Sequence, residues 1–171
     1  MLVDSRKKIM PLGKLRIELG KLRGKGVKIV STNGCFDLLH AGHVRVLEAA
    51  KSLGDVLVVG VNSDASVRKL KGPKRPINKA RSRAEVVAGL GCVDFVCIFP
   101  ETTPVKFIKA VLPQIHVKGG EYEVGKMPES KTVREGGGRI VLVKMVPGHS
   151  TTKVIGRIRH QTGAAAGSDR K

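Results

Sequence analysis

The sequence is poor in aromatic residues. They make up 3% of the 171 residues, and tryptophan is absent. Domains that bind single-stranded nucleic acid interleave basic and aromatic side chains, because the bases stack on the rings. The scarcity of aromatics therefore argues against a domain of that kind, although the chain carries a formal net charge of +18.

Cysteine and long apolar runs are also scarce. The three cysteines, Cys35, Cys92 and Cys97, lack the pairing of a zinc site, which fits a reducing compartment. No apolar run reaches the ~18 residues that a membrane-spanning helix needs. The first ten residues lack the apolar core of a secretory signal. We expect a cytoplasmic protein without a membrane span.

The positive charge is concentrated in three segments. Residues 1–28 hold nine Lys or Arg against two acids, and residues 153–171 hold five against one. Basic ends of this kind are either solvated or contact a polyanion. The third segment, 68–83, has eight basic residues and no acid, and Gly72 and two prolines interrupt it. A run of one sign in a loop suggests contact with a nucleotide triphosphate, a sugar phosphate or a nucleic acid.

Strand and helix patterns alternate along the chain. Short β-branched or apolar runs predict strands, and apolar residues at helical spacing between polar caps predict helices. This alternation predicts an α/β fold, a Rossmann-like five-stranded parallel sheet with helices on both faces and with ligands at the carboxyl ends of its strands. The expected strands are 27–32, 55–61, 93–99, 114–118 and 139–143. The expected helices are 9–22, 42–53, 63–70, 78–90, 104–111, 128–135 and 150–158. We expect a basic helical extension over 1–26, one domain over 27–158 and an unstructured tail over 159–171.

The first strand-to-helix turn carries His40 and His43, three residues apart where a helix begins. Residues at this spacing share a helix face, and the amides and dipole of a helix N-terminus attract anions. Small residues between the imidazoles, Ala41 and Gly42, let a phosphate approach the backbone. The alternatives are a purely structural histidine pair and a metal site completed by Asp37. No further ligand has a suitable spacing, so we expect no protein-bound metal.

The segment Asn33-Gly-Cys-Phe-Asp-Leu-Leu-His-Ala-Gly-His43 resembles the H-x-G-H signature of the cytidylyltransferase-like nucleotidyltransferases. Ser150-Thr-Thr152 resembles their second nucleotide motif. Between the two, Gly60–Val67, Leu70–Ile77 and Val117–Tyr122 are similar to the branch that adenylylates D-glycero-β-D-manno-heptose 1-phosphate. The resemblance covers roughly residues 27–158. It implies AMP transfer from ATP to a sugar 1-phosphate with release of pyrophosphate, for ADP-heptose and lipopolysaccharide synthesis, with Mg²⁺ carried by ATP.

The resemblance also implies roles for individual residues. Catalytic roles fall to His40, His43, Lys71 and Lys118. Nucleotide binding falls to Thr32, Asn33, Gly34, Cys35, Phe36, Gly42, Arg83, Gly119, Gly120, Ser150, Thr151 and Thr152. Asp37, Asn62, Lys74 and Arg75 are expected to contact the sugar phosphate.

Two other functions stay open at this point. One is a cytidylyltransferase for glycerol phosphate or another polyol phosphate. The other is a non-catalytic nucleic-acid-binding protein on the same fold, against which both histidines and the Ser-Thr-Thr turn argue. A homodimer is expected by analogy with the family. His149 precedes the second motif at a place where the family more usually has an acidic or aromatic residue, so the resemblance implies no contact between this residue and the nucleotide base.

Overall fold

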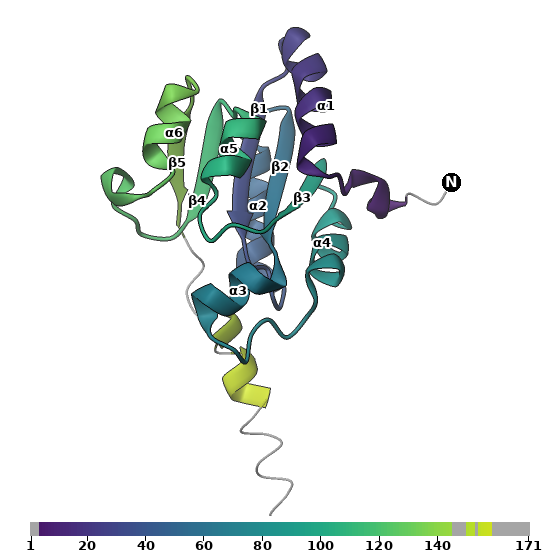
Figure 1. Cartoon of the computed structure of the whole chain (residues 1–171), viewed down its shortest axis with the longest axis vertical. Coiled ribbons are helices and arrows are strands. Elements are labelled where there is room, and N and C mark those ends of the chain that lie inside the picture. Colours follow the sequence, from purple (N-terminus) through teal and green to yellow (C-terminus); the bar gives the residue numbers. More distant parts are fainter. Residues whose placement is uncertain (1–3, 145–149, 153, 159–171) are drawn as a thin grey trace, which may run out of the picture.

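The computed structural model describes residues 4–144, 150–152 and 154–158. Its centre is one sheet of five parallel strands in the order β3-β2-β1-β4-β5 (Figure 1). Every pairing between neighbouring strands is parallel, so the predicted fold class is confirmed. The strands are β1 (Ile29–Gly34), β2 (Val56–Asn62), β3 (Phe95–Phe99), β4 (Ile115–Gly119) and β5 (Arg139–Val143).

Helices cover both faces of the sheet, as the sequence predicts. One buried cluster joins α2 and α4 to the face that carries Val30 and Val59. The other joins α1, α5 and α6 to the face that carries Ile29 and Val58. The α-helices are α1 (Leu12–Gly24), α2 (Ala41–Lys51), α3 (Asp64–Lys71), α4 (Ala80–Ala88), α5 (Val105–Val111) and α6 (Ser130–Glu135), with short 3-10 turns η1 (Ser5–Lys8) and η2 (Val124–Lys126).

The sequence of strand β2 is almost wholly apolar because both of its faces are buried. Leu57, Val59 and Val61 belong to one buried cluster, and Val58 belongs to the other. A strand covered on both faces has no solvent side to be marked by polar residues. Gly60 lies where a Cβ would come within 3.1 Å of the rings of Phe99 and Phe107, so its missing side chain leaves room for that stacked aromatic pair.

The N-terminal helix belongs to the body of the domain. The sequence predicts a basic helical extension over 1–26, and in the structure Leu15 and Leu19 of α1 are fully buried and pack with α5 residues in one cluster. The segment before α1 is also fixed, because Lys8 Nζ donates to the carbonyls of Leu90 and Val93 at 3.3 and 2.7 Å. An apolar pair at i, i+4 thus outweighs the surrounding charge in deciding where the helix lies.

The strand order reverses between β1 and β4, where the chain continues to opposite sides of the sheet. Parallel α/β sheets bind ligands outside the carboxyl ends of the strands at such a point. Residues 151–152 and 154–158 are helical, and Thr151 Oγ1 donates to the Leu38 carbonyl at 3.4 Å. The C-terminal helical residues therefore lie beside the turn between β1 and α2.

Two expectations fall outside the described residues: the tail over 159–171 and the surroundings of His149. Within the described part of the chain, no helix combines the length and the apolar character that crossing a bilayer would require.

Candidate functional site

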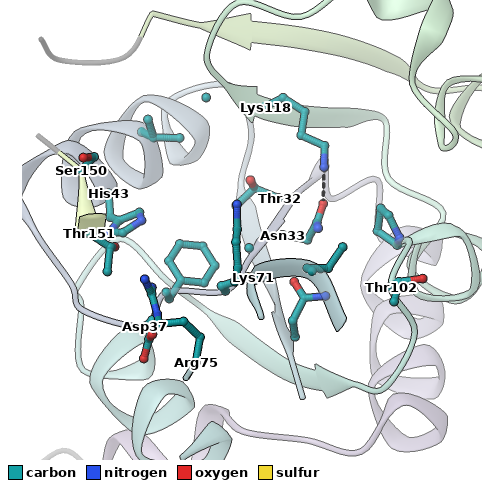
Figure 2. A pocket seen from close by; sticks show the side chains of 18 of the residues that line it. Thr32, Asn33, Asp37, His43, Lys71, Arg75, Thr102, Lys118, Ser150 and Thr151 are labelled. Atoms are coloured by element: carbon teal, nitrogen blue, oxygen red, sulfur yellow. Dashed lines mark hydrogen bonds and ion pairs between the residues drawn. The ribbon is translucent and has the colours of Figure 1, made fainter. Parts of the chain in front are cut away.

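A cavity of about 590 Å³ opens at the carboxyl ends of β1 and β4 (Figure 2). Sixteen of the twenty predicted site residues line it, so most of the motif-bearing segments converge on one space. They are Thr32, Asn33, Gly34, Cys35, Phe36, Asp37, His40, His43, Asn62, Lys71, Arg75, Lys118, Gly119, Ser150, Thr151 and Thr152.

Four predicted residues, Gly42, Gly120, Lys74 and Arg83, do not line this cavity. Sequence reasoning assigned no role to several residues that do line it. These are Val46, Leu70, Thr102, Thr103, Pro104, Tyr122, Pro128 and Glu129. Leu70 and Tyr122 stand in the motif segments without a role of their own, and the others stand outside those segments.

His40 and His43 lie at the start of α2, with His40 as its N-cap. Their rings stack with centroids 3.8 Å apart and an angle of 22° between planes. Burial, with a smaller contribution from the neighbouring His40, lowers the pKa of His43 to about 4. The Nδ1 atom of His43 is buried and has no hydrogen-bond partner among the described residues. A neutral imidazole with an unsatisfied buried nitrogen is suited to receive a ligand.

The β1–α2 turn sets the position of the His43 ring. Phe36 has a positive φ of 46°, and its ring lies 5.3 Å from that of His43. A Cβ added to Gly34 would come within 3.1 Å of Phe36 Cε2. Glycine at this position therefore lets the Phe36 ring fold back over the end of β1 and pack beside the imidazole.

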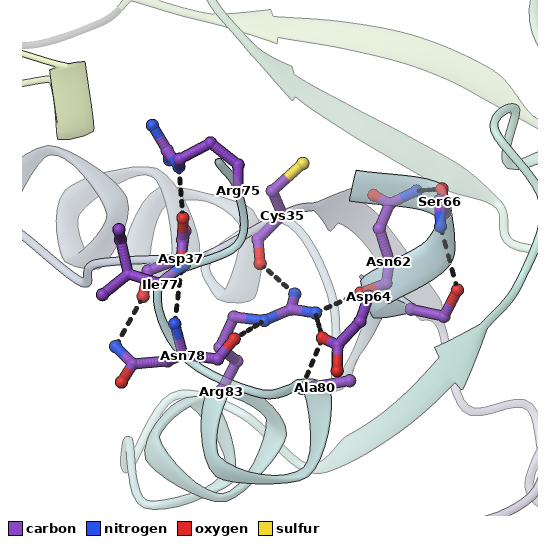
Figure 3. Close-up of polar contacts among 11 residues, drawn as sticks. Cys35, Asp37, Asn62, Asp64, Ser66, Arg75, Ile77, Asn78, Ala80 and Arg83 are labelled. Carbon is purple, nitrogen blue, oxygen red and sulfur yellow. Dashed lines mark hydrogen bonds and ion pairs between the residues drawn. The ribbon is translucent and has the colours of Figure 1, made fainter. Parts of the chain in front are cut away.

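Asp37, which was expected to contact the sugar phosphate, fixes the basic loop instead. Its carboxylate is almost fully buried and accepts hydrogen bonds from Arg75 Nε and from the amides of Ile77 and Asn78 (Figure 3). The Asn78 side chain returns a bond to the Asp37 carbonyl at 2.9 Å. The loop that carries Arg75 is thereby anchored to the turn before α2.

Arg83, which was expected to bind phosphate, holds protein groups instead. Its guanidinium is fully buried and pairs with Asp64 at 2.8 Å. It also donates to the carbonyls of Cys35, Asn62 and Asn78 (Figure 3). Its donors are committed to acceptors on four segments, so Arg83 ties the β1–α2 turn to β2, to α3 and to the basic loop.

The Asn62 amide, also expected to contact the sugar phosphate, is used within the protein. Its Nδ2 atom donates to Ser66 Oγ at 2.9 Å and to the Glu101 carbonyl at 3.3 Å. These bonds join the end of β2 to α3 and to the loop after β3. Asn62 therefore shapes the wall of the cavity on the side of Thr102.

Lys118, the last residue but one of β4, lies on the opposite wall. Its ammonium donates to Asn33 Oδ1 at 2.7 Å (Figure 2) and lies 2.7 Å from a Glu129 carboxylate oxygen. One step deeper in the sheet, Ser31 Oγ is 2.8 Å from Nδ1 of the fully buried His116. Burial, and to a lesser extent Lys118, lower the pKa of His116 to about 3, so this histidine is neutral beneath the site.

The cysteines do not have the character of nucleophiles. Burial raises the pKa of Cys35, which lines the cavity. Burial also raises the pKa of Cys97, to about 11. Thiols of this kind stay protonated at neutral pH. Within the described residues, no group of three or more His, Cys, Asp or Glu side chains could hold a metal ion.

Comparisons with known proteins agree on one family. The profile of the cytidylyltransferase-like family matches residues 31–157. The chain is 52% identical over 157 residues to the bifunctional protein HldE of Geobacter metallireducens, covering 91% of this chain and 32% of that protein. It is 52% identical over 136 residues to HldE of Trichlorobacter lovleyi, covering 80% and 28%. The chain thus spans about a third of the length of these relatives.

Two solved structures share the fold. The lipopolysaccharide core biosynthesis protein of Thermoplasma volcanium matches with a TM-score of 0.59 and 30% identity, over 71% of this chain and 98% of that chain. The pantoate-beta-alanine ligase of Francisella tularensis matches with a TM-score of 0.58 and 15% identity, over 80% and 66%. The second likeness concerns the fold alone.

Proposed function

The chain belongs to the cytidylyltransferase-like family, and from that premise we propose that it transfers AMP from ATP to D-glycero-β-D-manno-heptose 1-phosphate. The sugar phosphate oxygen attacks the α-phosphorus of ATP, the bond to the β-phosphate oxygen breaks, and ADP-heptose and pyrophosphate form. The similarity to the bifunctional protein HldE, together with the resemblance of the motifs to the heptose 1-phosphate adenylyltransferases, supports this choice.

The observation that carries the proposal is the convergence of two motifs on one cavity. His40, His43 and Ser150–Thr152 line the same space, and Figure 2 places His43 beside Ser150 and Thr151. At the start of α2 the amides of His43 and Val44 bond to the His40 carbonyl, and the amides of Ala41 and Gly42 before them have no carbonyl one turn earlier in the helix to meet. Imidazoles, hydroxyls and helix amides are together suited to a triphosphate that gains charge at its leaving group.

In this proposal the two imidazoles donate to the triphosphate and to the oxygen that becomes the pyrophosphate leaving group. Lys71 lies at the end of α3 and lines the cavity, where its ammonium binds the phosphates of both substrates. No covalent intermediate is needed. Positioning two anions in line and offsetting their charge accounts for most of the rate enhancement.

Mg²⁺ enters the proposed reaction as the companion of ATP. The two carboxylates that line the cavity are both engaged, Asp37 by Arg75 and Glu129 by Lys118. A magnesium ion that keeps most of its water and binds chiefly to substrate phosphates fits this arrangement. We further propose a cytoplasmic homodimer, which sedimentation or light scattering of the purified protein tests.

The direct test is a grid of pyrophosphate-release assays. ATP and CTP are each paired with heptose 1-phosphate and with glycerol 3-phosphate in the presence of Mg²⁺. We expect release only with ATP and heptose 1-phosphate. Release with CTP and glycerol 3-phosphate would replace the proposal by the cytidylyltransferase alternative. No release from any pair, together with steeply salt-dependent binding to DNA or RNA, would favour the non-catalytic one.

A further inference from the structure

The two carboxylates of the cavity differ in how fully they are used. Both oxygens of the Asp37 carboxylate accept hydrogen bonds, Oδ2 from Arg75 and Oδ1 from the amides of Ile77 and Asn78. Glu129 lies just before α6 and is 3% exposed, yet it lines the cavity. Among the described residues its ion-pair partner is Lys118, which meets one carboxylate oxygen, Oε1. The second oxygen of Glu129 keeps its capacity to accept hydrogen bonds.

Asn33 and Lys118 offer the complementary groups beside Glu129. Asn33 Oδ1 accepts from Lys118, so the Asn33 NH₂ group is left to donate elsewhere, and it forms no hydrogen bond within the described residues. The Lys118 ammonium has three protons, of which Asn33 and Glu129 take two. This wall of the cavity therefore presents three groups close to one another. They are the charged acceptor of Glu129, the neutral donor of Asn33 and the cationic donor of Lys118.

The charge of this wall separates it from the phosphate-binding part of the cavity. A buried carboxylate repels phosphate oxygens, and its pairing with Lys118 removes the net positive charge that a phosphate needs. Figure 2 shows Lys118 and Asn33 on one side, with His43, Ser150 and Thr151 on the other and Lys71 between them. The ligand group that reaches Glu129 must therefore be uncharged and must both donate and accept hydrogen bonds.

We infer that Glu129, Lys118 and Asn33 bind two adjacent hydroxyl groups of a sugar ring. One hydroxyl donates to the Glu129 carboxylate, and the other accepts from Lys118 or from the Asn33 amide. Hydrogen bonds to charged groups are the stronger ones, and a buried carboxylate left without its donor is costly. This wall thus discriminates between a vicinal diol and a deoxy sugar.

The inference rests on the proposed function for the identity of the sugar, since both substrates carry one. The diol belongs either to the ribose of the nucleotide or to the ring of the sugar 1-phosphate. Calorimetric titration of Glu129→Gln and wild type with ATP, with 2′,3′-dideoxy-ATP, with heptose 1-phosphate and with its 2-deoxy analogue separates the two. Binding is measured without turnover, so the result does not depend on pyrophosphate release.

We expect Glu129→Gln to weaken binding of one hydroxylated ligand about tenfold and to leave its deoxy analogue unaffected. An effect on ATP assigns the wall to the ribose, and an effect on heptose 1-phosphate assigns it to the acceptor. Equal weakening of a ligand and its deoxy analogue, or no change in any titration, would overturn the inference. If no sugar phosphate releases pyrophosphate while the ATP pair still shows the effect, the proposed function fails and the diol site stands.

Glu123→Gln is the matched control, because Glu123 is exposed on the same segment, pairs with Lys126 and does not line the cavity. Glu129→Asp is the second variant, in case the glutamine variant folds poorly. It keeps the charge and withdraws the carboxylate by one methylene. We expect it to lose affinity for the same ligand as Glu129→Gln, by a smaller factor, and unchanged affinity for that ligand would count against the inference.

Discussion

Arg83 of α4 and His43 of α2 both lie next to the β1–α2 turn, but Arg83 is buried among protein acceptors whereas His43 is half-buried and faces the cavity. The Arg83 guanidinium meets one carboxylate and three carbonyls, and its side chain is fully buried. The His43 ring lines the cavity, and its Nδ1 atom has no hydrogen-bond partner within the described residues. The family resemblance implied a catalytic role for His43 and nucleotide binding for Arg83.

The difference separates a residue that builds the site from one that faces the ligand. A saturated buried cation stabilises the fold around it, and removing it leaves its acceptors unpaired. An unsatisfied buried nitrogen costs stability in the empty protein and becomes favourable only when a ligand supplies the partner. Mutation of each residue tests this comparison: a change at His43 should lower activity, and a change at Arg83 should lower stability. The opposite pattern would contradict it.

The largest effect is expected for His43→Ala. If the imidazole donates to the triphosphate in the transition state, kcat/KM for pyrophosphate release falls by about 10²- to 10⁴-fold. Urea unfolding should give a free energy close to that of the wild type, because the change removes ring contacts with His40 and Phe36 but no hydrogen bond at Nδ1. Near-normal turnover would remove His43 from the site and leave it as a packing residue.

Arg83→Met should destabilise the protein by about 3–5 kcal/mol, because Asp64 and three carbonyls lose their donor. Urea unfolding monitored by circular dichroism measures this loss. Arg83→Lys keeps the charge and part of the hydrogen bonding, and we expect an intermediate value. A variant that unfolds like the wild type and yet binds ATP poorly would return Arg83 to the role of a phosphate ligand.

Acid should destabilise the protein through the buried histidines. The folded-state pKa values of His43 and His116 lie at about 4 and about 3, below the ordinary value near 6.5. Their contribution to stability is therefore complete above pH 6.5 and is lost as the pH falls toward the folded values. Between pH 7 and 5 we expect a loss on the order of 1–2 kcal/mol per histidine in the free energy of unfolding.

ATP sharpens this pH comparison. A triphosphate beside His43 should raise the pKa of His43 and reduce the stability that His43 loses in acid. His116 is buried in β4, so its contribution to the acid loss should not change with ATP. Unfolding titrations with and without ATP at pH 5 and 7, repeated on His43→Asn, separate the two contributions. An acid loss that His43→Asn leaves unchanged would contradict the assignment.

The smallest effect is expected for Asp37→Asn, which removes the charge that holds Arg75 and the loop amides. We expect the basic loop to open more often, so that trypsin cleaves after Lys71 or Lys74 a few-fold faster and KM for ATP rises by a similar factor. Asp94→Asn is the control, because Asp94 accepts from Lys51 and from the amide of Leu57 away from the cavity. Equal cleavage rates in both variants would show that Asp37 does not fix the loop.

The local parts of the fold could be predicted from the sequence. The apolar run of β2, the helix that begins after His40 and the alternation of elements follow from short-range patterns, and all appear at nearly the expected residues. The position of α1 could not be predicted, because the high positive charge of the segment suggests a helix exposed to solvent. The burial of Leu15 and Leu19 fixes the helix against the domain. Burial of two side chains outweighs many solvated charges.

The site divides in the same way. His40, His43 and Ser150–Thr152 could be predicted because each set stands in one contiguous motif at a helix start. Glu129 could not be predicted, because no pattern in the sequence links it to Lys118, and the folded structure brings the two side chains together. The protein contacts of Arg83 could not be predicted, because its partners come from four separate segments and no local pattern in the sequence shows which carbonyls a guanidinium will meet.

Gly34 shows how a residue without functional groups governs the chemistry. Its missing Cβ is the space that the Phe36 ring occupies, and that ring flanks His43. A side chain at Gly34 would require the Phe36 ring to shift by a few tenths of an ångström, and this ring packs beside the His43 imidazole. Gly34→Ala would then lower activity although Gly34 has no side chain that could contact a substrate. The effect would pass from Gly34 through the Phe36 ring to His43.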